Sequence, residues 1–295
     1  MTAPALTLHG VLPAIVTPFT KDGSAVDQKS LIRLIDSLLE GGVHGIVACG
    51  STGEATTLSD SEYVEVVKLV RERTAGKVPC VAGISVSSTQ RAVQIARVIK
   101  ELSCDAILVA TPPYNKPSQA GIIEHFKAIG AASGLPLIAY NVPGRSGVAI
   151  TSVTLGLLSH QGIITAIKEA SGSIDNFADI KVAVTPECQV LSGDDSLFLG
   201  ALAYGGRGVI TVVGNAYPNE MVALYSAFER GDAREACRIQ LDLLPLCRAA
   251  FMESNPVPIK AALALKKVID HDTVRLPLTS LAPASFERVQ KEFAR

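Results

Sequence analysis

Short apolar segments rich in valine and isoleucine alternate with longer amphipathic segments along most of the chain. The apolar segments are continuous rather than alternating, which is typical of parallel strands that helices cover from outside. They predict eight strands, at residues 11–17, 45–50, 79–84, 106–111, 137–142, 165–170, 189–193 and 208–213.

The segments between these strands carry apolar residues at helical spacing. In residues 59–74, Ser59 and Glu62 form the capping-box pair that satisfies free backbone amides at the start of a helix. The pattern predicts helices at 28–40, 59–74, 89–102, 119–132 and 219–229.

Eight strand–helix units fit a (β/α)8 barrel better than an open doubly wound sheet. A dinucleotide-binding open sheet would carry a G-x-G-x-x-G fingerprint in its first strand–helix turn, and the turn after residue 17 has none. Beyond residue 231 the pattern is only helical, at 232–251, 258–265 and 283–293. We therefore expect an α/β protein with a TIM barrel in residues 1–231 and a C-terminal α-helical domain in residues 232–295.

Composition excludes several classes of protein. The 295 residues carry 27 basic and 28 acidic side chains, and this net charge of −1 argues against nucleic-acid binding. No apolar segment reaches the ~18 residues of a membrane span, and no charged and apolar leader opens the chain. The six cysteines form no C-x-x-C pair. We expect a cytoplasmic protein with reduced thiols, no metal and no nucleic-acid or membrane partner.

In a barrel of this kind, catalytic groups lie at the carboxyl ends of the strands. Lys168 lies near the end of the sixth predicted strand, on the same side as Ala166 and Ala170 and opposite Ile167. Desolvation between two small residues would favour the free amine that a Schiff-base nucleophile needs. The alternative is a strand-end lysine that pairs with Glu169 or extends to solvent.

Two further side chains follow the fifth strand. Tyr140 could transfer protons near the Lys168 amine, although a tyrosine there is also a common core residue. Arg145 lies in the next loop, where a guanidinium suits bidentate binding of a carboxylate. A solvated surface arginine is the competing interpretation.

Three loops give weaker signals. The segment Gly50-Ser-Thr-Gly-Glu54 could direct backbone amides at an anion, but a plain turn is favoured. The carboxylates of Asp194 and Asp195 could hold a divalent metal, but an acidic N-cap for the following helix is favoured. A proline-rich loop presents Tyr114. With no histidine cluster nearby, the sequence predicts no metal site.

The combination of these signals is far more specific than any one of them. Six motifs carry it: Gly50-Ser-Thr-Gly-Glu54, Pro113-Tyr-Asn-Lys-Pro-Ser118, Tyr140-Asn-Val-Pro-Gly-Arg-Ser-Gly147, Ile167-Lys-Glu-Ala170, Leu191-Ser-Gly-Asp-Asp195 and Asn255-Pro-Val-Pro-Ile-Lys260. In order and spacing they resemble the dihydrodipicolinate synthase/N-acetylneuraminate lyase family over essentially the whole chain. The arginine motif and the Tyr-Asn-Lys-Pro-Ser loop resemble the synthase branch rather than the sialic-acid lyases.

The resemblance implies a TIM barrel with a three-helix C-terminal domain, and a pyruvate-dependent aldolase reaction without a cofactor. By the family pattern, Lys168 forms an iminium with pyruvate, and the derived enamine attacks L-aspartate 4-semialdehyde. Transimination and cyclisation then give 4-hydroxytetrahydrodipicolinate, a step in diaminopimelate and lysine biosynthesis.

The resemblance also implies roles for the other site residues. Tyr140, Ser51 and Tyr114 match the proton-relay triad of the family, in which the tyrosine at 114 comes from a neighbouring subunit. Activity would then need a dimer, usually within a homotetramer that is a dimer of dimers. The substrate-binding positions implied by the resemblance are Thr52 for the pyruvate carboxylate, Arg145 for the aldehyde's carboxylate, and the backbone of Gly193 and Ile210.

One departure concerns feedback regulation. At the positions where inhibited family members bind lysine, this chain has Asp60, Tyr63, Ser87, Arg91 and Pro113. Arg91 replaces a glutamate and puts a cation where the lysine ammonium would lie, so we expect weak or absent inhibition by lysine. Two alternatives stay open: a related aldolase or dehydratase acting on a 2-keto-3-deoxy sugar acid, and a non-catalytic barrel that serves as a scaffold or ligand-responsive protein.

Overall fold

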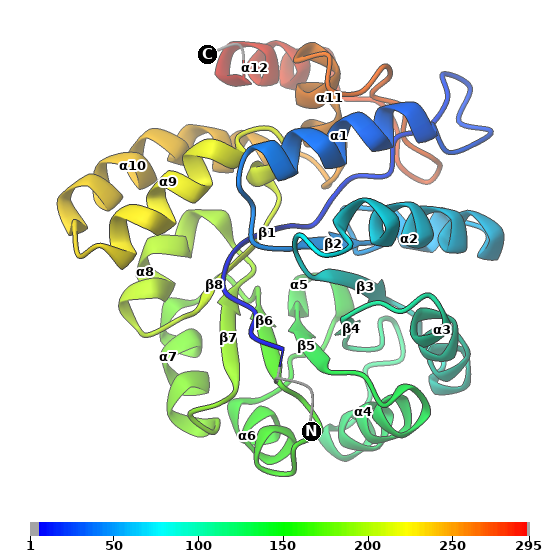
Figure 1. Ribbon diagram of the computed structural model, residues 1–295, viewed down its shortest axis with the longest axis vertical. Helices are drawn as coiled ribbons and strands as arrows, with labels where there is room; N and C mark the ends of the chain where they lie inside the picture. Colours follow the sequence, from blue (N-terminus) through cyan, green and yellow to red (C-terminus); the bar gives the residue numbers. More distant parts are fainter. Residues whose placement is uncertain (1–5, 294–295) are drawn as a thin grey trace.

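The computed structural model describes residues 6–293 and shows a parallel barrel with helices outside (Figure 1). Neighbouring strands follow the order β1-β8-β7-β6-β5-β4-β3-β2, and a parallel bridge from Ala14 to Val47 brings β2 beside the end of β1. Each strand overlaps one of the eight predicted segments. The strands are β1 (Gly10–Pro13), β2 (Ile46–Ala48), β3 (Cys80–Ile84), β4 (Ala106–Ala110), β5 (Leu137–Asn141), β6 (Ala166–Glu169), β7 (Gln189–Ser192) and β8 (Gly208–Thr211).

The five helices predicted in the barrel are confirmed within one residue at each end. The capping box is also confirmed, because Ser59 accepts from the Glu62 amide while the Glu62 carboxylate accepts from the Ser59 amide. The α6 and α8 helices are short and mostly apolar, so no polar face marks them in the sequence. The barrel helices are α1 (Gln28–Glu40), α2 (Asp60–Thr74), α3 (Thr89–Glu101), α4 (Gln119–Ser133), α5 (Pro143–Ser146), α6 (Ser152–His160), α7 (Ile174–Ala183), α8 (Phe198–Ala203) and α9 (Pro218–Glu229).

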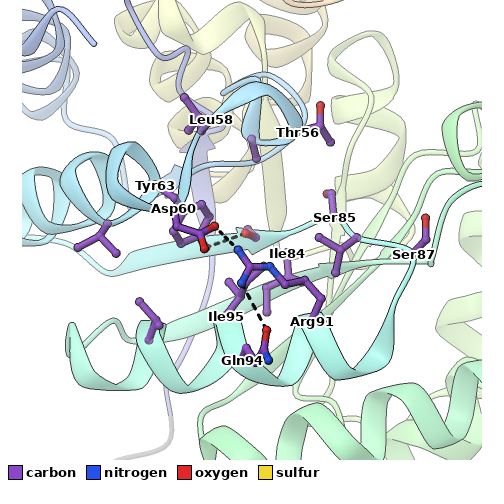
Figure 2. Close-up of a pocket in the computed structure, with 15 residues that line it drawn as sticks. Thr56, Leu58, Asp60, Tyr63, Ile84, Ser85, Ser87, Arg91, Gln94 and Ile95 are labelled. Carbon is purple, nitrogen blue, oxygen red and sulfur yellow. Dashed lines mark hydrogen bonds and ion pairs between the residues drawn. The ribbon is translucent and has the colours of Figure 1, made fainter. Parts of the chain in front are cut away.

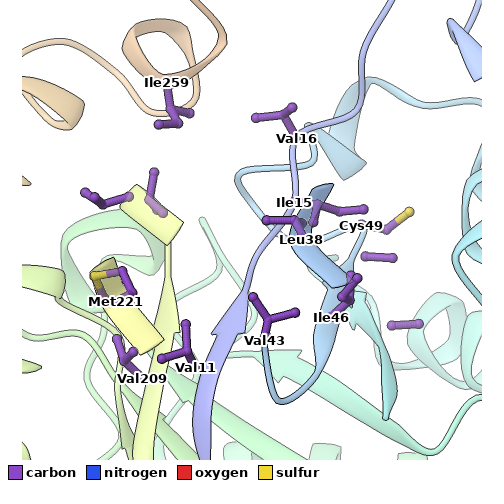
Figure 3. Packing of buried hydrophobic residues seen from close by; sticks show 14 of the residues in the cluster. Val11, Ile15, Val16, Leu38, Val43, Ile46, Cys49, Val209, Met221 and Ile259 are labelled. Carbon is purple, nitrogen blue, oxygen red and sulfur yellow. The ribbon is translucent and has the colours of Figure 1, made fainter. Parts of the chain in front are cut away.

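Two hydrophobic layers explain why the strands read as continuous apolar runs. An inner cluster, which includes Leu12, Ile138 and Leu191, fills the barrel. An outer cluster packs the strands against the helices, and Figure 3 shows part of it, with Val11 and Val209 near Met221 of α9. Both faces of each strand are therefore buried, as a parallel barrel requires. The six cysteines are free thiols, and no helix within residues 6–293 combines the length and apolarity needed to cross a membrane.

Three helices follow the barrel: α10 (Ala233–Ala250), α11 (Val257–Leu265) and α12 (Pro283–Phe293). The α10 helix packs along α9, and α12 packs against α10 and α11 (Figure 1). The segment that follows α11 contacts α1, where Arg33 pairs with Asp270 at 2.5 Å. The predicted helices after residue 231 are thus present. The division into domains 1–231 and 232–295 stays a prediction.

A fully buried lysine ties α11 to the turn after β2. The ammonium of Lys260, which is 0% exposed, forms an ion pair with the carboxylate of Glu54. It also donates to the carbonyl of Thr273 at 2.7 Å and lies 4.1 Å from the centre of the Phe19 ring. Burial lowers the pKa of Lys260 to about 8, and Glu54 acts in the opposite direction. The loss of either partner would leave an uncompensated buried charge.

The second oxygen of Glu54 is also satisfied. It accepts the main-chain N–H of Arg275 at 3.0 Å, and the guanidinium of Arg275 pairs with Glu62 of α2 at 2.5 Å. Glu54 itself adopts a left-handed conformation, with φ of 51°. The carboxylate contacts therefore fix the position of the turn that Glu54 ends, residues 50–54.

Candidate active site

Lys168 and Tyr140 are brought together by the pairing of β5 with β6. Tyr140 lies directly opposite Lys168 in the parallel register, and the lysine Nζ is 4.3 Å from the centre of the tyrosine ring. Ala166 belongs to the inner cluster and Ile167 to the outer one, so Lys168 points into the barrel as strand alternation predicts.

The neighbouring carboxylate does not neutralise this lysine. Glu169 points to the other side of the strand, where it accepts from the Asn141 side chain at 2.7 Å and the Ser171 amide at 2.8 Å. Lys168 is only 4% exposed, and among residues 6–293 no carboxylate oxygen lies within 4.0 Å of its ammonium. The alternative of a strand-end Lys168–Glu169 ion pair is therefore wrong.

The backbone of Gly193 passes close to the Lys168 side chain. A Cβ at this position would lie 3.0 Å from Cε of Lys168 and 2.6 Å from the Cβ of Ala170. The Gly193 amide also donates to the Glu169 carbonyl at 2.6 Å. Only glycine fits beside the lysine without displacing it. Ile210, the other predicted backbone position, is fully buried in the inner cluster.

A cavity of about 280 Å³ opens at the carboxyl ends of β4 and β5. Ser51, Arg145 and Asn255 line it, together with Ala110, which pairs with Tyr140 in the β4–β5 register. Lys168 and Tyr140 do not belong to the cavity lining. The structure thus places Ser51 and Arg145 in one cavity and puts Tyr140 on the strand next to its wall.

Three main-chain amides, those of residues 53–55, form hydrogen bonds to carbonyl groups within the turn at residues 50–54. Gly53 and Ala55 donate to the carbonyl of Gly50, and Glu54 donates to that of Ser51. These three amides are therefore not free to converge on an anion.

Thr52 is buried and is connected to Arg145 through a single residue. The Thr52 hydroxyl accepts from the Asn255 side-chain amide at 2.9 Å, and the Arg145 guanidinium donates to the Asn255 carbonyl at 3.2 Å. Both predicted carboxylate-binding residues therefore contact Asn255.

Tyr114 is not part of this cavity in the single chain. Its side chain is 92% exposed, and its φ of 69° is unusual for a non-glycine residue. The preceding residue, Pro113, lines the cavity. The structure therefore separates Tyr114 from Ser51 and Tyr140 of the same chain.

The prediction of an acidic N-cap at residues 194–195 is wrong. Asp195 does not cap its own helix but accepts the amides of Val212 and Val213, at 3.0 and 2.9 Å, after β8. Asp194 accepts the Gly172 amide at 3.0 Å, after β6. Burial raises the pKa of both carboxyl groups. No group of three potential metal ligands was found among the described residues.

The structural roles of Glu54, Asn255 and Lys260 were not predicted from the sequence. The motifs that contain them were recognised, but without a function for these side chains. Lys260 carries the clearest signal, since a lysine inside the apolar run of α11 needs a carboxylate partner when buried. Asn255 has no comparable signal, because its contacts are with residues more than 100 positions away.

A second cavity, of about 350 Å³, lies between α2, β3 and α3 (Figure 2). Asp60, Tyr63, Ser87 and Arg91 all line it, and Arg91 forms an ion pair with Asp60. The Tyr63 hydroxyl donates to the Gly83 carbonyl at 2.8 Å. Pro113 is not among the lining residues but accepts a hydrogen bond from Ser87 at 2.9 Å. Four of the five residues considered for lysine binding therefore line one cavity, and the fifth, Pro113, contacts one of them.

Comparison with known proteins agrees with this architecture. The model of the dihydrodipicolinate synthetase family matches residues 7–294. The chain belongs to this family. A 4-hydroxy-tetrahydrodipicolinate synthase of Citrifermentans bemidjiense is 44% identical over 289 residues, covering 97% of this chain and 98% of the relative.

Solved structures of the dihydrodipicolinate synthetase family have the same fold. A chloride-inhibited dihydrodipicolinate synthase of Acinetobacter baumannii, complexed with pyruvate, has a TM-score of 0.93 and 38% identity, and the match covers 98% of this chain and 99% of that one. An enzyme of Cyanidioschyzon merolae with lysine bound has a TM-score of 0.93 and 36% identity, with 97% of both chains covered.

The contact between Gly193 and Lys168 gives a direct test. We expect Gly193→Ala to lower the free energy of unfolding by about 1–3 kcal/mol, because the new methyl group overpacks the interior. It should also displace Lys168 and slow catalysis. Gly144→Ala is the matched control at the same barrel mouth, because its Cβ would meet no atom within 4 Å. Urea unfolding and steady-state kinetics measure both effects, and equal behaviour of the two variants would contradict the prediction.

Proposed function

We propose that the protein condenses pyruvate with L-aspartate 4-semialdehyde to 4-hydroxytetrahydrodipicolinate, in diaminopimelate and lysine biosynthesis. The observation that carries the proposal is the buried Lys168 amine, which lies against Tyr140 without a carboxylate partner at the mouth of the barrel. The relatives named 4-hydroxy-tetrahydrodipicolinate synthase and the pyruvate-bound structure support it.

In the proposed reaction, the Lys168 amine attacks the ketone carbon of pyruvate, and loss of water gives an iminium. The iminium withdraws electrons, so the methyl group loses a proton and becomes an enamine carbon. That carbon attacks the aldehyde and forms the new carbon–carbon bond. The amine of the second substrate then displaces Lys168 from the iminium, which closes the ring and frees the enzyme.

The other residues would position the substrates and move protons. We assign proton transfer to Tyr140, Ser51 and Tyr114. Thr52 would bind the carboxylate of pyruvate and Arg145 that of the aldehyde, for which a guanidinium offers bidentate geometry. The backbone at Gly193 and Ile210 would complete the wall of the site.

The exposure of Tyr114 supports a homo-oligomer in which this side chain enters the site of a neighbouring subunit. The family relation supports an oligomer, and we propose a homotetramer built as a dimer of dimers. The partners are then the two small-molecule substrates and further copies of the chain, without nucleic acid or membrane. We propose a cytoplasmic location.

Borohydride trapping tests the covalent step. Reduction in the presence of pyruvate should attach the keto acid irreversibly to Lys168, as peptide mass spectrometry would detect. Lys168→Arg should abolish both labelling and turnover. The buried Lys260 serves as an internal control, since its ion pair with Glu54 should leave it unlabelled. A non-catalytic barrel would show no pyruvate-dependent label at Lys168.

The same assay extended to substrates separates the two enzymatic hypotheses. Turnover with aspartate semialdehyde should exceed turnover with 2-keto-3-deoxygluconate and with N-acetylneuraminate. The reverse order, with labelling of Lys168 retained, would support the sugar-acid aldolase instead.

Subunit exchange tests the role of Tyr114. Tyr114→Phe and Lys168→Arg should each be nearly inactive alone. Mixed oligomers of the two variants should regain activity, because a site with an intact Lys168 then receives an intact Tyr114 from its neighbour. If Tyr114 acts within its own chain, no mixed site is complete and activity stays absent after mixing.

Inhibition by lysine should be weak or absent. Arg91, paired with Asp60 in the second cavity, puts a cation where the lysine ammonium would lie. The Arg91 and Asp60 side chains are 41% and 77% exposed, so solvent screens part of the repulsion, but a like charge still opposes binding of the lysine ammonium. Initial rates measured against increasing lysine check this, and a sub-millimolar inhibition constant would refute it.

A further inference from the structure

Asn255 joins the two residues proposed to bind substrate carboxylates. Its side chain is 5% exposed and lies at the wall of the 280 Å³ cavity. The side-chain amide donates to the Thr52 hydroxyl at 2.9 Å, while the main-chain carbonyl accepts from Arg145 at 3.2 Å. One residue thus contacts the turn after β2 and the loop after β5.

These hydrogen bonds leave donor groups of Thr52 and Arg145 available to bind substrate carboxylates. A hydroxyl carries one donor and can accept as well. Because the Thr52 oxygen accepts from Asn255, its own O–H remains available to donate to a carboxylate. Arg145 has five N–H donors and gives one to Asn255, so enough remain for a bidentate contact.

The side-chain amide of Asn255 does not form all the hydrogen bonds that would favour the folded state. Its Oδ1 atom is buried and has no hydrogen-bond partner among the described residues. A buried acceptor without a partner costs free energy, so such groups in native proteins call for an explanation. Orientation of Thr52 by this side-chain amide would explain why an amide with an unpaired oxygen occupies the position, whereas a contribution to stability would not.

The position of Asn255 is fixed from both sides. The helix that follows it, α11, is anchored through Lys260 to Glu54, two residues beyond Thr52. The segments 50–54 and 255–260 are therefore joined twice, once by the ion pair and once by the Asn255–Thr52 hydrogen bond. The side-chain amide of Asn255 is therefore held in a fixed position relative to Thr52.

We infer that Asn255 is a positioning residue that orients the Thr52 hydroxyl toward pyruvate through its side chain and holds Arg145 for the second substrate through its main chain. The inference rests on the proposed function. It predicts unequal effects on the two substrates, because a side-chain substitution removes the contact with Thr52 but keeps the carbonyl that binds Arg145.

Steady-state kinetics of Asn255→Ala test this directly. The KM for pyruvate should rise about tenfold, the change expected from the loss of one hydrogen bond in a binding site. The KM for the aldehyde and kcat should change much less. The free energy of unfolding should stay close to that of the wild type, since the substitution also removes the unpaired Oδ1. Asn219→Ala, at an exposed position on α9, is the matched control.

A double-mutant cycle separates positioning from general structural damage. In a Thr52→Val background, which has no hydroxyl to orient, Asn255→Ala should have no further effect on the KM for pyruvate. Asn255→Asp provides a second variant of the same size if the alanine variant does not fold. Its carboxylate can only accept, so the Thr52 O–H turns toward it and the KM for pyruvate again rises.

The outcomes distinguish this inference from the proposed function. A wild-type enzyme that neither condenses the two substrates nor labels at Lys168 would overturn the function itself. A wild-type enzyme that does both, with full additivity in the cycle or equal rises in the two KM values, would overturn only the positioning role of Asn255.

Discussion

The barrel mouth depends on a carboxylate and an ammonium that are both removed from solvent, those of Glu54 and Lys260. Burial of such a pair is tolerated only when its remaining polar atoms are satisfied. Here the Thr273 carbonyl and the Arg275 amide meet that condition. The turn after β2 and the start of α11 consequently cannot move apart. The C-terminal helices therefore hold one wall of the site as well as covering the barrel.

The two deeply buried lysines differ in their surroundings, and this difference gives one a structural role and the other a proposed catalytic role. Lys260 forms an ion pair with a carboxylate and donates to a carbonyl, and in this protonated form its nitrogen has no lone pair with which to attack a substrate. Lys168 is almost as buried, but it lies over the Tyr140 ring and beside the Gly193 backbone, while Glu169 binds Asn141. An amine without a fixed carboxylate partner can react with a carbonyl group. Equal burial thus has opposite consequences for reactivity.

The sequence pattern predicts what depends on local periodicity. The eight strands and the inward direction of Lys168 follow from apolar runs and strand alternation, which short-range geometry determines. The contacts of Asn255 with Thr52 and of Lys260 with Glu54 span 203 and 206 residues, and no local rule encodes them. The wrong N-cap at Asp195 has the same origin. The Asp195 carboxylate accepts the amides of Val212 and Val213, which lie 17 and 18 positions further along the chain, instead of amides in its own helix.

The loop around Tyr114 is shaped by contacts that leave its aromatic side chain outside the fold. The Asn115 side chain donates to the Ser87 carbonyl at 3.1 Å, and the Ser87 hydroxyl donates to the Pro113 carbonyl at 2.9 Å. These bonds hold Tyr114 at a positive φ, which is unfavourable for a residue with a Cβ. Within one chain, neither the strained backbone nor the exposed ring is offset by packing. Both are accounted for if the ring is buried by a neighbouring copy, as the proposed exchange of Tyr114 between subunits requires.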